Sequence, residues 1–212
     1  MHIADGVLSV PVLAVGSAAA AAGVAAGLWR LDYERIPRVA VLSSAFFVAS
    51  LIHVPIGPTS AHLILSGLAG LILGWAAFPA ILVALLLQAM LFGFGGLTTL
   101  GVNTVNMAVP AVVCYYLFGR GVRSGSPALV FGAGGAAGAF AVALGCAMAS
   151  LALLASGREF LVVAEVFYVS HIPIIVAEGL VTGSAAAFLR KVRPELLRLP
   201  EYARLREGVE HA

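Results

Sequence analysis

The stretch Pro127–Ala155, which reads PALVFGAGGAAGAFAVALGCAMASLALLA, contains no charged side chain. A helix needs about 20 mostly apolar residues to cross the hydrocarbon core of a bilayer, and this stretch exceeds that length. Across the whole chain, hydrophobic residues make up 61%, charged residues only 10%, and the mean hydropathy is +1.05. Ordinary soluble domains contain about 25% charged residues. The composition therefore predicts a polytopic membrane protein whose surface is covered by lipid.

Working outward from this stretch, seven segments are apolar and long enough to be membrane-spanning helices. We expect these spans at Val10–Leu28, Val39–Val54, His62–Phe78, Pro79–Phe94, Thr104–Phe118, Pro127–Ala155 and Val169–Leu189. Only a turn around Trp75–Pro79 separates the third span from the fourth, so the two should form a tight antiparallel hairpin. The predicted fold class is all-α, with residues 1–212 forming a single integral membrane domain.

The basic residues predict the orientation of these spans. If seven spans alternate in direction, Arg158 lies on one side of the membrane and the other eleven Lys and Arg residues lie on the opposite side. Loops rich in Lys and Arg stay in the cytoplasm. We therefore expect residues 1–9 outside the cell and residues 190–212 to form a basic tail in the cytoplasm.

The first span lacks the features of a cleaved signal peptide. A secretory signal begins with a positively charged region, whereas this chain begins MHIADGVLS and has no basic residue before Arg30. We expect an uncleaved helix. Met1 should also be retained, because removal of the initiating methionine generally requires a small second residue and His2 is not small. A free α-amino group would then lie beside an imidazole at the outer face.

This orientation brings residues 1–9, 53–62 and 93–103 to the outer face. Four of the five histidines lie at or near that face, namely His2, His53, His62 and His171. Polar side chains and irregular Gly/Pro backbone at this depth are tolerated where they line a buried pocket. We therefore expect a small polar pocket beneath the 53–62 and 93–103 segments. Further candidates for its lining are Ser60, Thr99 and Asn103.

The N-terminus has the chemistry of a metal chelator. The α-amine of Met1, the amide nitrogen of His2 and the His2 imidazole can close two fused rings around one ion in a single plane. One further imidazole would complete a square, and His62 is our candidate for it. Square-planar nitrogen coordination favours Ni(II) or Cu(II), with Co(II) a less comfortable fit, and it disfavours Mg or Ca.

Structural roles fit several of these residues as well. His53 could cap the outer end of the second span, and His171 could form a hydrogen-bonded pair with Glu178, seven residues further along the same helix face. The same pair could serve as a relay in a self-sufficient secondary transporter for a metal or another ion. Thr99 and Asn103 are better suited to satisfying loop backbone or orienting a histidine than to direct metal ligation.

Four motifs follow one another along the chain, at Met1–Ser9, at Gly57–His62, at Gly95–Asn103, and at His171–Ile174 with Glu178–Gly179 and Lys191–Glu195. Together they resemble the nickel and cobalt substrate-binding subunits of energy-coupling-factor (ECF) transporters, of the CbiM/NikM type. The first resembles an MHIPDG-type start, the second a Gly/Ser/Thr-rich segment that ends in histidine, and the third a GGLTTLGAN loop. The resemblance covers nearly the whole chain, although Ala4 stands where proline is common and His53 is an additional imidazole.

The resemblance implies a six-helix ECF substrate-binding fold with an added N-terminal helix that brings the chain's first residues into the core. It implies that the transported Co(II) or Ni(II) is held by Met1, His2 and His62, with no bound organic cofactor. The implied partners are a transmembrane coupling subunit, two cytoplasmic ATPases and often a small additional membrane subunit. The implied location is the plasma membrane of a bacterium or archaeon, without a nucleic-acid partner.

Other function classes have weaker support in the sequence. No G-x-x-x-x-G-K-[ST] phosphate loop is present, so ATP hydrolysis is expected on the partner subunits and not on this chain. The HExxH motif of many metalloproteases is also missing from the sequence. We therefore expect a transport subunit that is not an enzyme and has no catalytic residues. The sequence does not distinguish cobalt from nickel.

Overall fold

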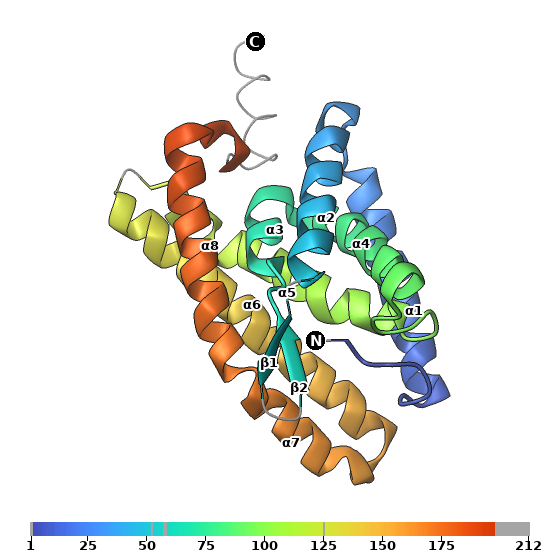
Figure 1. Cartoon of the computed structure of the whole chain (residues 1–212). Helices are drawn as coiled ribbons and strands as arrows, with labels where there is room; N and C mark the ends of the chain where they lie inside the picture. The colour runs from blue at the N-terminus through green and yellow to red at the C-terminus, as the bar shows by residue number, and fades with distance from the viewer. Residues whose placement is uncertain (1, 52, 57–58, 125, 198–212) are drawn as a thin grey trace.

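The computed structural model describes every residue except 1, 52, 57–58, 125 and 198–212, and for residues 53–56 and 59–62 it describes the backbone only. Eight α-helices make up most of the described part (Figure 1). They are α1 (Val10–Trp29), α2 (Ile36–Leu51), α3 (Ser66–Leu73), α4 (Ala77–Phe92), α5 (Leu100–Val122), α6 (Pro127–Ser156), α7 (Leu161–Ser170) and α8 (Ile172–Val192). Four short 3-10 helices connect or end them, at Tyr33–Arg35, Gly74–Ala76, Arg158–Phe160 and Pro194–Leu197.

Five helical stretches in the described residues are long and apolar enough to cross a membrane, namely α1, Ser66–Phe92, α5, α6 and Arg158–Val192. The predicted class, a helical membrane protein, is therefore confirmed, but seven separate spans are not seen by this measure. Helix α2 has 16 residues, which corresponds to about 24 Å at 1.5 Å per residue. That is shorter than a hydrocarbon core of about 30 Å.

The third predicted span, His62–Phe78, is wrong as a single helix. His62 ends strand β2 (Thr59–His62), and α3 contains only eight residues. Positive φ angles at Leu65 (54°) and Gly74 (56°) interrupt the backbone on either side of α3. Hydropathy reports the apolar character of side chains and is insensitive to such turns, so the sequence pattern merged a strand, a turn and a short helix.

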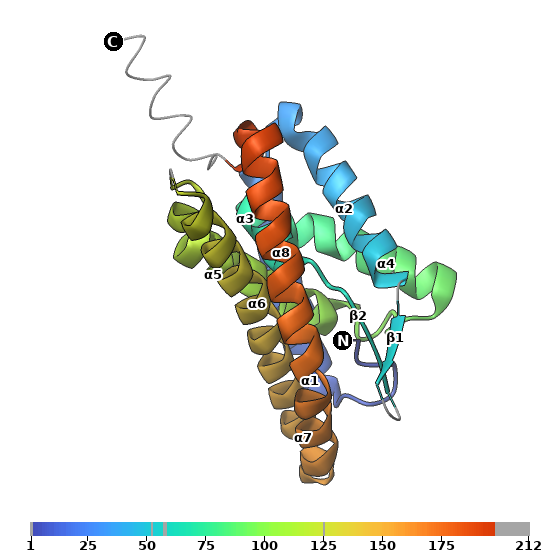
Figure 2. The same ribbon diagram turned by 60° about the vertical axis from the view of Figure 1, so that its left-hand side comes forward.

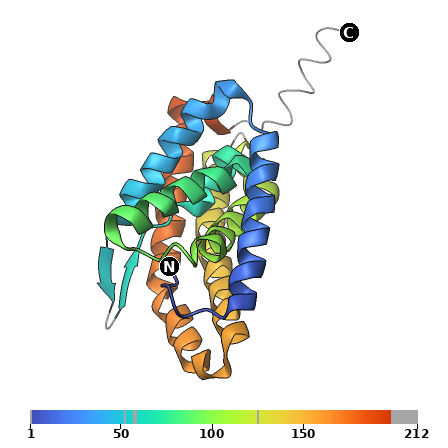
Figure 3. The ribbon, with the colours of Figure 1, turned by 90° about the vertical axis from the view of Figure 1, so that its right-hand side faces the viewer.

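The 53–62 segment, expected as an irregular loop, contains an antiparallel hairpin of β1 (His53–Ile56) and β2. The fold is therefore helical with one small hairpin. In the strand register His53 pairs with His62 and Pro55 pairs with Ser60. Figure 3 shows the hairpin at the edge of the bundle, on the side opposite α1.

Helix α6 packs along α8, and the two run side by side in Figure 2, while α5 packs against α6. Small residues at Gly134, Gly138 and Gly183 leave no room for a larger side chain between α6 and α8, as is usual where membrane helices pack closely. Helix α1 packs against this bundle through its own small residues. Gly16 lies against Val102 of α5, and Gly23 lies against Phe78 of α4.

The last predicted span, Val169–Leu189, is divided at His171, where α7 ends and α8 begins. Pro173 occupies the first turn of α8. A proline lacks the N–H that a continuous helix would need and is well suited to a helix start. The division places His171 at a helix junction instead of inside a span.

Candidate functional site

The first residues of the chain run back into the helical bundle. Ile3 and Leu8 are buried in an apolar cluster with Val102 of α5 and with residues of α6 and α7, namely Ala149, Leu153 and Ala164. The N–H of Ser9 donates to the hydroxyl of Ser156, the last residue of α6, over 3.1 Å. The segment before α1 is therefore docked inside the protein and is not an extended tail.

Two polar side chains at the start of α5 hold the backbone of Ile3. Its N–H donates to Oδ1 of Asn103 over 3.1 Å, and Nδ2 of Asn103 donates to its carbonyl over 3.0 Å. The hydroxyl of Thr99 donates to the same carbonyl over 2.8 Å. Asn103 and Thr99 are both buried. These residues were expected to satisfy loop backbone or to orient a histidine. Both bond the backbone of the N-terminal segment, and the Thr99 hydroxyl also lies 3.4 Å from the carbonyl of Gly96 in its own loop.

Asp5 forms the other half of this attachment. Its Oδ1 accepts the hydroxyl of Thr98 over 2.5 Å, the N–H of Thr98 over 3.1 Å and the N–H of Thr99 over 3.3 Å. The hydrogen bond from the Thr98 side chain, followed by those from backbone N–H groups, lowers the pKa of Asp5 below its ordinary value. The carboxylate lies so close to Gly96 that a Cβ there has no room.

Sequence reasoning assigned no role to Asp5. A usable signal was present, since Asp5 is the only acidic residue before Asp32 in an otherwise apolar segment. An isolated charge beside a membrane span needs hydrogen-bond donors, and the predicted outer loop supplies them in Thr98 and Thr99.

His2 lies against the segment between α4 and α5. Its ring stacks with that of Phe94, with centroids 6.5 Å apart and an interplanar angle of 15°. Gly95, with φ of 79°, passes close beneath it, so that a Cβ at position 95 would lie 3.5 Å from the Cβ of His2 and 3.1 Å from Nδ2 of Asn103. The imidazole is half-buried. The structure thus brings His2, Thr99 and Asn103 together at one end of α5.

The other proposed ligand comes from the hairpin. The register places His62 opposite His53, which brings two residues nine positions apart in the chain side by side in the backbone. Met1 lies outside the described residues, and so do the side chains of His53, Ser60 and His62. Their predicted roles therefore remain predictions. Among the described residues, no three His, Cys, Asp or Glu side chains form a metal-binding group.

The predicted hydrogen-bonded pair of His171 and Glu178 is wrong. Nδ1 of His171 lies 2.7 Å from the carbonyl of Phe167, and Oε1 of Glu178 accepts the N–H groups of Ile64 and Leu65. Their remaining polar atoms, Nε2 and Oε2, have no hydrogen-bond partner within the described part of the chain. Seven residues of helix span about 10 Å, so a shared helix face does not bring the two groups into contact.

His171 is nevertheless arranged as a lone-pair donor. A carbonyl can only accept, so Nδ1 carries the proton in the bond to Phe167 and Nε2 presents its lone pair. Ligating histidines are commonly oriented in this way. The side chain is 4% exposed, and its ring packs on that of Phe167 at a centroid distance of 4.4 Å.

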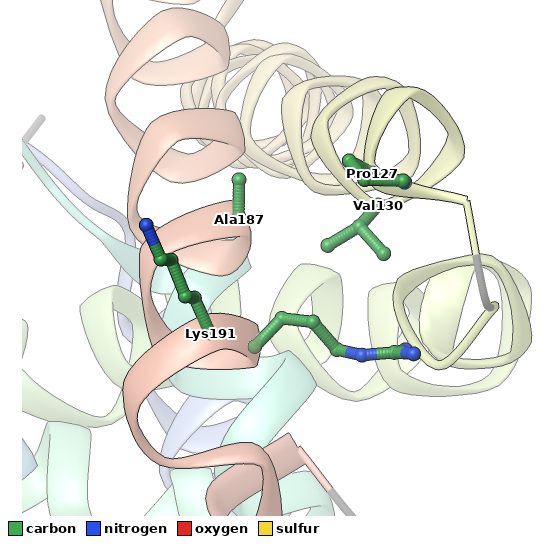
Figure 4. A pocket seen from close by; sticks show the side chains of 5 residues that line it. Pro127, Val130, Ala187 and Lys191 are labelled. Atoms are coloured by element: carbon green, nitrogen blue, oxygen red, sulfur yellow. The ribbon is translucent and has the colours of Figure 1, made fainter.

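A cavity of about 250 Å³ lies between the start of α6 and the end of α8 (Figure 4). Its lining is formed by Pro127, Val130, Ala187, Arg190 and Lys191. It begins at the first turn of α6, whereas the N-terminal segment bonds to the last residue of that helix, about 40 Å away at 1.5 Å per residue. Two cationic side chains would repel a metal ion, so this cavity is unsuited to the predicted chemistry.

The fold and this end of α5 define a polytopic helical membrane protein in which the segment from Ile3 to Ser9 is docked on the bundle. Residues 2–196 match the family model CbiM, described as the cobalt uptake substrate-specific transmembrane region. The chain belongs to this family, and the sequence-based resemblance is confirmed. It is a transmembrane component for cobalt or nickel uptake and not an enzyme.

Individual relatives agree with this assignment. The chain is 44% identical over 205 residues to a Haemophilus influenzae protein provisionally named a metal transport protein, covering 95% of this chain and 98% of that one. It is 35% identical to the cobalt transport protein CbiM of Sorangium cellulosum, covering 98% and 99% of the two chains. A crystal structure described as that of a transition metal transporter has a TM-score of 0.74 and 27% identity, covering 91% of this chain and 93% of that one.

Proposed function

We propose that the chain captures Co(II) or Ni(II) outside the cell through four nitrogen atoms. These are the α-amine of Met1, the backbone nitrogen and the imidazole of His2, and the imidazole of His62. The observation that carries the proposal is the attachment of Ile3 to Asn103 and Thr99. Two buried polar side chains of the membrane bundle form hydrogen bonds with the backbone of Ile3, the residue next to the proposed chelator.

The donor set suits the proposed cargo. Nitrogen ligands in a plane favour Ni(II) and accept Co(II), and the displacement of an amide proton requires a strongly polarising ion. Relatives carry both metals in their names. The chain is 38% identical to the fused nickel transport protein NikMN of Rhodobacter capsulatus, over 93% of this chain and 64% of that longer protein. Cobalt and nickel are therefore both retained as candidate cargo.

The proposed topology has seven crossings, with residues 1–9 outside and the basic tail of residues 190–212 in the cytoplasm. In this arrangement β2 and α3 together cross the membrane from the outside to the cytoplasm, and α4 crosses back to the outside. A strand and a short helix therefore replace the third predicted span. The α1–α2 connection and the end of α8 lie at the same end of the molecule in Figures 1 and 3. Of the nine Lys and Arg residues that the structure describes, six lie in these two segments, namely Arg30, Arg35, Arg38, Arg190, Lys191 and Arg193. This supports a cytoplasmic assignment for that end.

Aromatic side chains support the same assignment. The guanidinium of Arg30 lies 4.7 Å from the ring centroid of Trp75, and the indole N–H of Trp75 donates to the hydroxyl of Tyr116 over 3.0 Å. Trp and Tyr gather at the membrane interface, where one side of the ring is apolar and the other meets water. This aromatic group would mark the cytoplasmic boundary of the bilayer.

The proposed partners are an ECF transmembrane coupling subunit, two cytoplasmic ATPases and a small additional membrane subunit. ATP hydrolysis on the ATPases would drive inward release, because this chain has no phosphate-binding loop. In this proposal the chain has the six-helix substrate-binding fold of ECF transporters, and α1 is its added N-terminal helix.

The proposal is tested by altering the N-terminus. Protein with its native N-terminus should bind Ni(II) and Co(II) in equilibrium dialysis, and protein with two residues added before Met1 should lose most of that binding. His62→Ala should weaken binding and change the visible absorption of the nickel complex. Equal binding by native and extended protein would overturn the chelation by the amine. Metal uptake into vesicles without ATP or partners would favour a self-sufficient transporter.

A further inference from the structure

Helix α8 carries a carboxylate in the interior of the bundle. Glu178 is fully buried, and its Oε1 accepts two backbone N–H groups from a distant segment, that of Ile64 and, over 2.8 Å, that of Leu65. A buried charged side chain in a membrane protein is costly and usually has a function. Here the carboxylate is directed at the backbone that follows the hairpin.

That backbone has a specific need for an acceptor. Ile64 and Leu65 lie between the end of β2 and the start of α3, so their N–H groups belong to no strand ladder or helix. Leu65 has φ of 54°, the only positive φ at a residue other than glycine in the described chain. Non-helical backbone at membrane depth persists only where the protein satisfies it. Glu178 supplies this acceptor, and the turn at Leu65 is held against α8.

The held turn immediately follows a proposed metal ligand. His62 is the last residue of β2, two positions before Ile64, so at most about 7 Å of backbone separates the two along the chain. Strand β1 is paired to β2 throughout. Fixing Ile64 and Leu65 therefore fixes the end of the hairpin from which His62 extends.

We propose that Glu178 is a positioning residue of the metal site, acting through the Ile64–Leu65 backbone to hold His62 in place. This inference rests on the proposed function, since it assigns His62 to the metal. Glu178 itself contacts no metal. Its role is to connect α8 with the hairpin, so that the fourth ligand meets the N-terminal chelate in a defined position.

Neighbouring residues supply matched comparisons. In Glu178→Gln a carbonyl oxygen can still accept both N–H groups, whereas Glu178→Ala leaves both without an acceptor. Thr182 lies one turn further along α8, is equally buried, and its hydroxyl has no hydrogen-bond partner among the described residues. Thr182→Val therefore changes a buried polar group on the same helix face without touching the turn.

The experiment measures nickel affinity by dialysis for the full chain and for these three variants, together with His62→Ala and the His62→Ala/Glu178→Ala double variant. Glu178→Ala should lose about tenfold or more in affinity, as when groups that orient ligands are removed. Glu178→Gln and Thr182→Val should stay near the parent protein. The double variant should bind no more weakly than His62→Ala alone, because both changes act on one ligand. A purely structural role would instead give losses that add.

A second measurement needs no metal. With Cys114 and Cys146 replaced by alanine, spin labels at Ser60 and at Leu151 of α6 report the position of the hairpin against the bundle. Glu178→Ala should broaden the distance distribution, and Glu178→Gln should leave it narrow. Wild-type affinity or a narrow distribution in Glu178→Ala would overturn the inference. If the parent protein binds no nickel, the proposed function is overturned instead. The distances between the spin labels would still decide whether Glu178 holds the hairpin.

Discussion

Ile3 and Asn103 hold each other through two reciprocal hydrogen bonds of 3.1 and 3.0 Å, although 100 positions separate them in the chain. The side-chain amide of Asn103 satisfies both the N–H and the carbonyl of Ile3. This relationship docks the residue that follows His2 onto α5, and it leads to the first prediction.

Asn103→Ala should weaken nickel binding by about tenfold, in line with the loss of a group that orients a ligand. Removal of the amide also leaves the buried N–H of Ile3 without its acceptor, at a cost of about 1–3 kcal/mol, while the carbonyl of Ile3 keeps the Thr99 hydroxyl as a donor. Calorimetric titration with nickel measures the affinity. Asn106→Ala is the control, since Asn106 is also buried on α5 and its Nδ2 has no hydrogen-bond partner in the described part. Equal losses in the two variants would contradict the prediction.

The attachment of Asp5 should depend on pH. Its pKa is lowered in the folded protein, chiefly by the Thr98 hydroxyl, so docking favours the charged form. The contribution is fully present above the ordinary pKa of 3.8 and is lost as the pH falls through the lower, folded value. Amide hydrogen exchange at Thr98 and Thr99 in metal-free protein reports the contact.

Asp5→Asn supplies the comparison for that measurement. The parent protein should show stronger protection than Asp5→Asn at pH 6, and the difference should shrink as the pH falls below about 3.8. A difference that stayed constant down to pH 2 would show that the charge of Asp5 does not support docking.

Gly96→Ala should disturb the same contact from the other side. The carboxylate of Asp5 occupies the place of the new Cβ, so the Asp5 side chain must shift away from its hydrogen bonds with Thr98 and Thr99. We expect weaker nickel binding and faster exchange at Thr99. Gly132→Ala is the control, because a Cβ at Gly132 of α6 meets nothing within 4 Å. An unchanged affinity in Gly96→Ala would mean that the segment is not held as closely as described.

Gly16→Leu should destabilise the bundle by separating α1 from α5. Val102 fills the space beside Gly16, and overpacking of a close contact typically costs about 1–3 kcal/mol. Thermal unfolding in detergent measures the effect as a lower midpoint. Val15→Leu changes the preceding residue, which is 70% exposed, and should leave the midpoint unchanged. A loss of stability in both variants would point to a general effect of larger residues in α1.

Much of the proposed site could be formulated from the sequence because its chemistry is local. The three proposed donor nitrogens of Met1 and His2 are adjacent in the chain, and the predicted topology alone placed the loop residues Thr99 and Asn103 at the same face. The role of Asp5 and that of Glu178 were not predicted. Each depends on backbone N–H groups about a hundred residues away, Thr98 and Thr99 for the first and Ile64 and Leu65 for the second. The residue type of a carboxylate does not show which distant backbone N–H groups it accepts.

The small residues of α1 illustrate the same division. The run of small residues Gly16–Gly23 is typical of close helix packing, but it does not identify the surface on which α1 packs. The structure assigns Gly16 to Val102 and Gly23 to Phe78, both within the chain's own bundle.

Composition and hydropathy by themselves determined a helical membrane protein, because a chain with 10% charged residues cannot cover its surface for water. Only the tertiary structure decided that residues 53–62 form a hairpin, that α3 ends after eight residues, and that the last span divides at His171. The physical reason is that the apolar environment of a membrane favours apolar side chains whatever the course of the backbone that carries them. Whether a buried turn can form depends on a distant side chain, here Glu178, that satisfies its N–H groups.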